Sequence, residues 1–306
     1  MNYTNYIAGG LASVGATIFT NPLDVIKTRI QLQGELTARG TYVKPYRGTL
    51  QAFLTVAEKD GVLALQKGLV PAICFQFILN FFRLGTFSTA GERGWCTDQQ
   101  GRPSFLRGMF WGAAGGALGS YISSPFSLVK TRMQAQAVES IAVGHQHNHA
   151  GMMNAFRDIY STDGVKGLWR GAVAVIPKAI LASGIQLATF TTTKDFLKHN
   201  NLVTNPTFNS FIGGFVAGTA MSLALTPPEV ILTRLYNQGI NEKGQGLYYR
   251  GMIDCLWKIW SVEGIHGLYK GFWPSYIRVG PHSTLVLVFY DKIIAAKDRF
   301  WNDNEK

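Results

Sequence analysis

The chain has 306 residues, of which 15% are charged and 47% hydrophobic, and its net charge is +11. The hydrophobic content excludes a disordered chain, and three cysteines, an odd and small number, argue against a disulfide-built scaffold. A soluble domain normally has about 25% charged residues. Few charges, 34 glycines and an excess of basic residues therefore favour a membrane protein.

Long stretches without charged residues predict six membrane spans, each able to cross about 30 Å of hydrocarbon with about 20 residues. Three stretches are uninterrupted: 1–23, 108–129 and 199–228. Three alternate with them and contain one cation each: Arg83 in 68–91, Lys178 in 171–193 and Arg278 in 271–290. The first stretch has no basic start and continues through Asn21-Pro22-Leu23-Asp24, so we expect neither a secretory signal nor a cleavable transit peptide.

Two motifs recur three times in register. The first begins with a proline and continues with acidic or hydroxyl and basic residues, at Pro22, Pro125 and Pro227. The second joins an acid–glycine pair to a basic residue and glycine seven positions later: Asp60-Gly61 with Lys67-Gly68, Asp163-Gly164 with Arg170-Gly171, and Glu263-Gly264 with Lys270-Gly271. This recurrence predicts three repeats of about 100 residues, namely 1–100, 101–200 and 201–306, each consisting of a span, a short amphipathic helix and a span.

Each proline lies inside a span, where it lacks an N–H and crowds the preceding turn. Three equivalent kinks would bring three helix ends together on a pseudo-threefold axis. Small residues four positions apart precede each proline, a spacing that lets helix backbones approach closely: Gly9 and Ser13, Gly112 and Gly116, Gly214 and Gly218. The short helix of the first repeat is predicted at residues 49–59.

With these repeats the whole chain resembles the mitochondrial carrier family. Four shorter strings resemble its oxaloacetate and dicarboxylate branch: Leu65-Gln66-Lys67-Gly68-Leu69, Arg83-Leu84-Gly85, Leu232-Thr233-Arg234-Leu235-Tyr236-Asn237-Gln238 and Arg278-Val279-Gly280-Pro281-His282. The resemblance implies an all-α membrane protein, a monomeric barrel of six transmembrane helices in the lipid of the mitochondrial inner membrane. It implies that both termini face the intermembrane space, and that the site opens alternately to the cytoplasm and the matrix.

The cations inside spans are the leading candidates for a substrate site, because an ionisable residue at membrane depth costs roughly 2.5–3.5 kcal/mol and normally faces protein or water. Lys178 and Arg278 each follow a repeated basic residue by eight positions, so we expect them at one depth. The resemblance places substrate contacts at this level and assigns them to Gln76, Lys178 and Arg278. Arg83, roughly 12 Å higher, would be a further cation facing the cavity. Snorkelling to a lipid headgroup or ion pairing with another span is the alternative.

Three span cations with no acid between them predict an anionic substrate. Arginine offers a fork that suits carboxylate or sulfate, and lysine a point charge. Two or three cations suit a small dianion such as a dicarboxylate, oxaloacetate, malonate or sulfate. Lys178 stands where the resemblance would place an adenine slot, which argues against a nucleotide. The oxaloacetate branch commonly has arginine there, so Lys178 is a departure that bears on affinity and selectivity.

We therefore expect an antiporter of small anionic metabolites. One alternative is an anion uniporter or regulated proton leak using the same cavity. A membrane-bound enzyme or a nucleic-acid-binding protein is the alternative from a different class. The sequence has no Ser/His/Asp arrangement, phosphate loop or metal-binding helix motif, so we expect no enzyme, no cofactor, no metal and no nucleic acid.

The resemblance also assigns a matrix-side gate to the proline motifs, in which the acid of one repeat pairs with the base of the next. Here the cycle pairs Asp24 with Lys130 and Glu229 with Lys27. The third pair, Ser127 with Leu232, is uncharged in both members, which is consistent with the cost of about 3–5 kcal/mol for one buried charge left alone. Gln31 and Gln134, four residues after the lysines, are expected to brace the two ion pairs, and Tyr236 takes the third place.

Glycines at the start of the cation-bearing spans suggest phosphate sites, because free N–H groups at helix starts bind anions. The resemblance implies cardiolipin at Gly68, Gly171 and Gly271, with the aromatic residues Trp169 and Tyr269 before two of them and Gln66 before the first. Plain helix capping is the alternative.

A run of alternating histidines, His145, His147 and His149, lies in a loop predicted on the matrix side. Alternate histidines can bind a metal, but no cysteine or acid accompanies them, so we do not expect a metal site.

Overall fold

The structure, a computed structural model, describes residues 3–38, 40–97, 104–199, 206–241 and 244–304. Within these residues the regular structure is helical, apart from one isolated bridge between Ile240 and Gly246. The helices are α1 (Tyr3–Leu32), α2 (Thr49–Lys59), α3 (Leu69–Glu92), α4 (Phe105–Ile122), α5 (Ser124–Ala135), α6 (Met152–Leu168), α7 (Val175–His199), α8 (Pro206–Asn237), α9 (Met252–Leu268) and α10 (Phe272–Asn304). Short 3₁₀ turns cover Val62–Gln66, Glu139–Ile141 and Ala172–Ala174.

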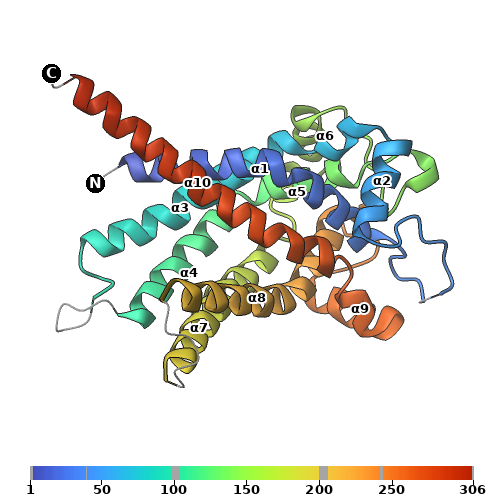
Figure 1. Cartoon of the computed structure of the whole chain (residues 1–306). Coiled ribbons are helices and arrows are strands. Elements are labelled where there is room, and N and C mark those ends of the chain that lie inside the picture. Colours follow the sequence, from blue (N-terminus) through green and yellow to red (C-terminus); the bar gives the residue numbers. More distant parts are fainter. Residues whose placement is uncertain (1–2, 39, 98–103, 200–205, 242–243, 305–306) are drawn as a thin grey trace.

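The long helices form a closed ring. Contacts join α1 to α3, α3 to α4 and α5, α4 to α7, α7 to α8, α8 to α10, and α10 back to α1. In Figure 1 these helices splay apart toward the end that carries both chain termini, and the shorter helices α2, α6 and α9 gather at the opposite end. The molecule therefore has an open end beside the termini and a narrow end beside the short helices.

The prolines do not produce three equal kinks. Pro22 lies inside the continuous helix α1, and Pro227 inside the continuous helix α8. In the second repeat the corresponding helix is interrupted at Ser123, which separates α4 from α5. Pro125 occupies the first turn of α5. A missing N–H is tolerated at that position because the first-turn N–H groups have no partner within the helix. The three prolines therefore occupy equivalent positions in the repeats, but the helix backbone around them is not equivalent.

Three buried arginines close the ring at the narrow end. Each stands seven residues after the motif proline and donates its Nε–H to a main-chain carbonyl of the next repeat. The third repeat donates back to the first, so the bonds form a cycle. The bonds are Arg29 to Gln134 O at 3.2 Å, Arg132 to Tyr236 O at 3.1 Å, and Arg234 to Gln31 O at 3.3 Å.

The second motif becomes a set of ion pairs beneath this ring. Asp60 binds Lys67 at 3.0 Å and also Arg29 at 2.7 Å, so the two motifs of the first repeat are joined. Glu263 makes the equivalent pairs with Lys270 and Arg234. In the second repeat Asp163 lies 3.4 Å from Arg170. The seven-residue spacing thus lets a base return to its own acid across the turn between two helices.

The close helix approach in the second repeat lies on a different face of α4 from the one predicted. A Cβ added at Gly119 would lie 2.8 Å from Leu79 O of α3, and one at Gly115 would lie 2.8 Å from Thr86 Cβ. Added Cβ atoms at Gly112 and Gly116 would meet open space. Gly112 and Gly116 have the same four-residue spacing as Gly115 and Gly119. The spacing alone therefore does not predict which face of α4 packs against α3.

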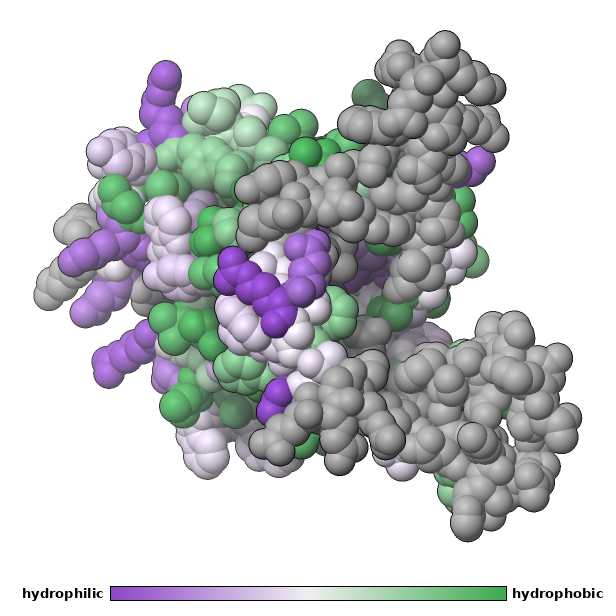
Figure 2. Space-filling view, turned by 90° about the vertical axis from the view of Figure 1, so that its left-hand side faces the viewer, coloured by the Kyte–Doolittle hydropathy of each residue, from purple (hydrophilic) through white to green (hydrophobic). Residues whose placement is uncertain are grey.

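Hydrophobic side chains cover much of the outside of the ring, including Phe19, Phe110 and Trp273, each more than 60% exposed. Figure 2, viewed from the open end, shows hydrophobic residues lying among hydrophilic ones on that face. Within the described residues, two helical stretches are by length and composition apolar enough to cross a membrane, Val62–Glu92 and Phe215–Asn237. Charged and polar residues lower the hydropathy of the other long helices.

Candidate functional site

Two ion pairs join α1 to its neighbours near the narrow end. Lys130 Nζ of α5 lies 2.7 Å from Asp24 Oδ2, and Lys27 Nζ donates to Glu229 Oε2 of α8. These are the two charged pairs predicted for the matrix-side gate, each formed between one repeat and the next. Their side chains are 6–16% exposed, so the charges are largely withdrawn from solvent.

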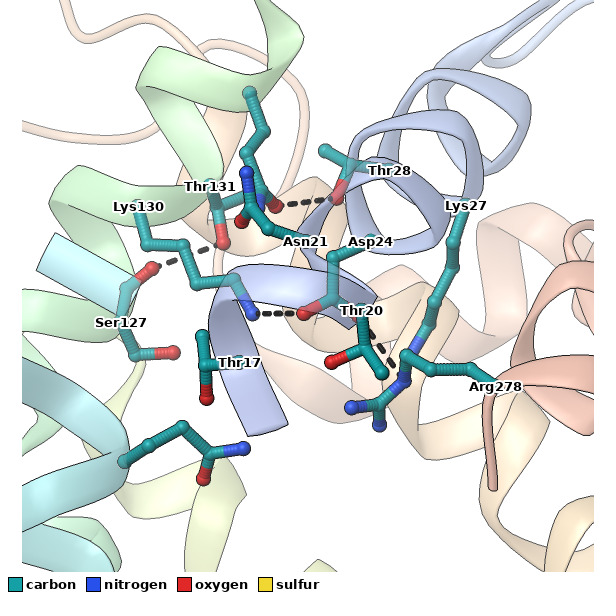
Figure 3. Close-up of polar contacts among 12 residues, drawn as sticks. Thr17, Thr20, Asn21, Asp24, Lys27, Thr28, Ser127, Lys130, Thr131 and Arg278 are labelled. Atoms are coloured by element: carbon teal, nitrogen blue, oxygen red, sulfur yellow. Dashed lines mark hydrogen bonds and ion pairs between the residues drawn. The ribbon is translucent and has the colours of Figure 1, made fainter. Parts of the chain in front are cut away.

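The span cations meet the same two acids. Arg278 Nε lies 3.0 Å from Asp24 Oδ1, and Lys178 Nζ lies 2.9 Å from Glu229 Oε1. Figure 3 shows Lys130 and Arg278 approaching the Asp24 carboxylate from different sides. Each acid is therefore shared between a gate lysine and a span cation.

This arrangement corrects the expectation that no acid lies between the span cations. Asp24 and Glu229 directly follow uncharged stretches of the sequence, which placed them at the ends of spans. Because α1 and α8 continue as helices through their prolines, both acids instead lie at the level of Lys178 and Arg278.

The pairing leaves donors open on the span cations. Arg278 Nε is within ion-pair distance of Asp24, yet its N–H is not aligned for a hydrogen bond and has no such partner among the described residues. The side chains of Arg278 and Lys178 are 20% and 31% exposed. An anion of the right size would therefore find donors that the protein has not satisfied.

Gln76 of α3 reaches this region through a histidine that the sequence analysis did not assign. Its Nε2 lies 3.4 Å from His282 Nε2, and His282 Nδ1 lies 3.1 Å from Thr20 Oγ1. His282 follows Arg278 by four residues, so the two share one face of α10. That spacing, in a span with few polar residues, was the available signal.

Arg83 lies apart from the other span cations. It follows Gln76 by seven residues on α3, toward the open end, and its side chain is exposed. No ion pair joins it to any residue that the structure describes. Its separation in depth from Lys178 and Arg278 stays a prediction, and its exposed charge is available to an entering anion.

The third place in the gate contains no ion pair within the described part of the chain. Leu232 is buried in an apolar cluster that includes Leu128, the neighbour of Ser127 on α5. Tyr236 lies 3.1 Å from Ser124 through their hydroxyl oxygens. The Tyr236 hydroxyl also interacts with the side chain of Ser127. Apolar packing and hydroxyl contacts thus occupy the position of a third bridge, and direct contact of Ser127 with Leu232 stays a prediction.

Gln31 and Gln134 link the same helices one turn beyond the ion pairs and do not bind the charged groups. Thr233 Oγ1 donates to Gln31 Oε1 at 2.7 Å. Thr28 Oγ1 donates to Gln134 Oε1 at 3.0 Å, and Gln134 Nε2 donates to Asn21. The glutamines therefore add a polar layer beside the two ion pairs, and bracing of the pairs stays a prediction.

The glycines predicted for cardiolipin have a packing role that is visible in the structure. Gly68, Gly171 and Gly271 have φ of +71°, +76° and +77°, a conformation that favours glycine. A Cβ on each would approach the next repeat at 2.9–3.1 Å, against Gln134, Tyr236 and Gln31 respectively. This is the helix-capping alternative. Beside Gly171 and Gly271, the N–H groups of Ala172 and Phe272 already donate to Trp169 O and Tyr269 O, and cardiolipin binding stays a prediction.

A cavity of about 630 Å³ lies between the second and third repeats. Gly171 lines it at one helix start, and Gly251 lines it at the start of α9. The cations Arg170 and Arg250 lie on its wall. The start of α9 and the exposed Arg250 beside this space suit a phosphate group. Arg170 already donates to Gly244 O at 2.8 Å and lies 3.4 Å from Asp163. Neither Arg250 nor Gly251 was among the predicted site residues.

The missed residues carry a repeated sequence signal. Tyr249-Arg250-Gly251 precedes α9 as Tyr46-Arg47-Gly48 precedes α2.

Trp169 and Gln66 occupy equivalent positions in their repeats and make equivalent hydrogen bonds. Trp169 Nε1 donates to Tyr121 O at 3.2 Å, and Gln66 Nε2 donates to Ile18 O at 3.1 Å. The missing aromatic residue of the first repeat is thus replaced by an amide that makes the same bond.

Two of the three loop histidines stack, and His145 meets His147 edge-on. The rings of His147 and His149 lie 5.5 Å apart and 9° from parallel. His147 Nε2 lies 2.9 Å from Asn237 O, and His149 Nδ1 lies 2.9 Å from Asp158. Burial and nearby Arg132 lower the pKa of His147 to about 3, so the ring is neutral near pH 7. No cluster of three metal-binding residues occurs in the described ranges.

Comparison with known proteins identifies the family. The family model described as mitochondrial carrier protein matches residues 1–93, 101–201 and 203–298. Human solute carrier family 25 member 35 is 45% identical over 290 residues, covering 94% of this chain and 97% of the human protein. The mitochondrial oxaloacetate transport protein of Saccharomyces cerevisiae is 36% identical, covering 95% and 88%, and that of Schizosaccharomyces pombe is 35% identical, covering 94% and 89%. The chain therefore belongs to the mitochondrial carrier family and is a transporter of the mitochondrial inner membrane.

Proposed function

We propose that this carrier exchanges small dianions, of the dicarboxylate, oxaloacetate or sulfate type, through a site formed by Gln76, Lys178 and Arg278. Six helical spans would cross the membrane, namely α1, α3, the pair α4–α5, α7, α8 and α10. The closed ring of contacts among them supports this topology. Two yeast relatives named as oxaloacetate transport proteins support the substrate class.

The observation that carries the proposal is the sharing of two acids. Asp24 lies between Lys130 and Arg278, and Glu229 lies between Lys27 and Lys178. A dianion that binds Arg278 and Lys178 competes with both carboxylates for these cations. Substrate binding therefore loosens both acids at once, and the same two acids hold the gate.

The ion pairs at the narrow end support a state that is closed there and open beside the termini. With the orientation that the family implies, this is the cytoplasm-open state. Opening toward the matrix requires separation of the Asp24–Lys130 and Lys27–Glu229 pairs, which loses their electrostatic energy. Only a ligand that binds the released groups more strongly in the opened state shifts that equilibrium.

Cardiolipin is proposed as the lipid partner at the cavity lined by Gly171 and Gly251 and at its counterparts in the other repeats. A monomer is proposed because the ring closes within one chain. The start of α9 behind Gly251 and the exposed guanidinium group of Arg250 support a phosphate ligand there.

The test is uptake by purified protein reconstituted in cardiolipin-containing vesicles. The panel contains malonate, oxaloacetate, sulfate, phosphate, a nucleotide and an amino acid, each with and without the same compound inside. Exchange of the small dianions that requires internal anion supports the proposal. Equal uptake into empty vesicles would show a uniporter. Preference for the nucleotide or the amino acid would show that the site has been assigned to the wrong substrate class.

A further inference from the structure

His282 of α10 lies where three helices meet at the proposed site. It is half-buried, and both ring nitrogens have partners on other helices. Nδ1 lies 3.1 Å from Thr20 Oγ1 of α1, and Nε2 lies 3.4 Å from Gln76 Nε2 of α3. The His282 side chain thus contacts Gln76, one of the residues proposed to bind substrate, and lies one helical turn from Arg278.

The neighbours define which nitrogen carries the proton. The Thr20 hydroxyl donates its hydrogen to Ala16 O at 3.0 Å, so its oxygen accepts from His282 Nδ1–H. That leaves Nε2 without a proton, and it accepts from the Gln76 amide. A neutral imidazole has one donor and one acceptor nitrogen, and this tautomer satisfies both neighbours.

Charged groups from three helices face the ring. Arg278 is on the same helix, Asp24 is on α1 and Lys130 is on α5. The α3 partner, Gln76, is neutral, and the acid of α8, Glu229, is bound to Lys27 and Lys178. Two cations against one carboxylate oppose a further positive charge in the empty site. A dianion bound at Arg278 reverses the local sign and favours the imidazolium.

We infer that His282 is a proton-binding residue of the anion site, which takes up a proton as the dianion binds and gives it up when the dianion leaves. The inference rests on the proposed function. The proton comes from water on the side that the site faces, bonds to the Nε2 lone pair, and returns to water from the same atom after the site has opened to the other side. No other bond forms or breaks.

Protonation also changes what Gln76 offers the substrate. An imidazolium has Nε2–H directed at the Gln76 amide nitrogen, and two donors facing each other repel. A half-turn of the amide brings Oε1 to accept from His282 and releases the NH₂ group. The amide donors are then free to bind the anion, so one proton adds a charge to the site and turns a donor toward the ligand.

Linkage makes this testable at equilibrium. If the anion favours protonated His282, then acidification must strengthen anion binding by the same coupling free energy. Sulfate is a suitable probe because it stays a dianion between about pH 5.5 and 8, the range in which histidine titrates. Malonate serves as the carboxylate probe in the upper half of this range.

The experiment compares the wild type with His282→Gln, which keeps a hydrogen-bonding amide beside Gln76 but cannot titrate. His266→Gln is the matched control, because His266 is an exposed histidine on α9. We expect the KM for external sulfate to fall as external pH falls, by at most about tenfold per pH unit for one proton, in the wild type and the control. In His282→Gln the KM should be independent of pH.

A second measurement does not depend on folding of the variant. Sulfate binding to the detergent-solubilised wild type is followed by calorimetry in two buffers of different ionisation enthalpy. A binding enthalpy that differs between the buffers shows proton uptake and supports the inference. The same binding enthalpy in both buffers overturns the inference, and so does a pH dependence of the KM that survives in His282→Gln. In either case, dianion exchange by the wild type leaves the proposed function standing. Failure of the wild type to bind or exchange either dianion at any pH overturns the proposed function as well.

Discussion

Arg278 Nε lies 3.0 Å from Asp24 Oδ1 without making a hydrogen bond to it. The cation proposed to bind substrate is therefore held near a gate carboxylate by charge rather than by directed bonding. Competition at such a contact is easier than at a bidentate pair, because the arriving anion gains hydrogen bonds that the carboxylate does not make.

Removal of the Arg278 guanidinium should abolish exchange. Arg278→Ala also leaves Asp24 with Lys130 alone, so the gate should stay closed and the protein should remain folded. Arg278→Lys should retain partial exchange, at least tenfold below the wild type, because the planar fork is lost. The measurement is dianion exchange in vesicles, with cardiolipin-dependent thermal stability as the folding control. Near-normal exchange by the alanine variant would remove Arg278 from the site.

Installation of the missing gate pair should show whether Ser127 and Leu232 meet. Ser127→Asp alone and Leu232→Lys alone should each destabilise the protein, because each places an unpaired charge beside an apolar cluster. Together they should rescue each other and form a bridge of about 1–3 kcal/mol, between exposed and buried values. Exchange by the double variant should be slower, because the closed gate is stabilised.

A double-mutant cycle on thermal stability and exchange rate measures this coupling. Effects that simply add would show that the two side chains do not meet at the narrow end. The control is Ser161→Asp with Leu232→Lys, because Ser161 is exposed on α6 and distant charges should not couple.

The buried acid Glu263 should dominate the response to acid at the narrow end. Burial alone would raise its pKa, but hydrogen bonds from Arg234 and Lys270 outweigh burial and lower the pKa. The stability that this acid contributes is therefore fully present above its unfolded pKa of about 4.3 and is lost as pH falls through the folded pKa. We expect Glu263→Gln to lower stability at pH 7 by about 3–5 kcal/mol.

Thermal unfolding in detergent between neutral and acid pH checks the Glu263 prediction, with Asp254→Asn as the control. Asp254 makes an exposed pair with Lys258 at 3.0 Å, and such pairs contribute about 0.5 kcal/mol or less. Equal melting temperatures for Glu263→Gln and Asp254→Asn at pH 7 would contradict the proposed importance of the buried cluster.

The cavity between the second and third repeats should bind cardiolipin through Arg250. Arg250→Gln should reduce the stabilisation by added cardiolipin and leave the stability without lipid unchanged, because the side chain is exposed. Lys166→Gln, an exposed change on α6, is the control. Gly171→Ala should instead lower stability with and without cardiolipin, because it strains a positive φ and approaches Tyr236. An unchanged response of Arg250→Gln to cardiolipin would place the lipid elsewhere.

The repeat spacing made much of the architecture predictable. Equal spacing of the motifs predicted three repeats, and the resemblance to the carrier family predicted which charged residues pair between them. Both charged pairs, Asp24–Lys130 and Lys27–Glu229, are present. The short helix predicted at 49–59 is confirmed as α2.

Contacts that depend on helix rotation were not predictable in the same way. Asp24 was expected to pair with Lys130, but its second partner, Arg278, depends on the depth at which α1 meets α10. The choice of Gly115 over Gly112 depends on which face of α4 turns toward α3. His282 was not predicted because no histidine stands four residues after the span cation in either of the other two repeats.

The cycle of arginine-to-carbonyl bonds has a consequence for biogenesis. The bond from Arg234 to Gln31 O joins the last repeat to the first, so the cycle is incomplete until the C-terminal third has been inserted. A chain that stops after two repeats leaves Arg132 without the carbonyl of Tyr236 and leaves Gln31 O without its donor. Such an intermediate has polar groups that lack the partners they have in the complete ring. Partial chains should therefore be less stable than the complete carrier, because the cycle closes only when all three repeats are present.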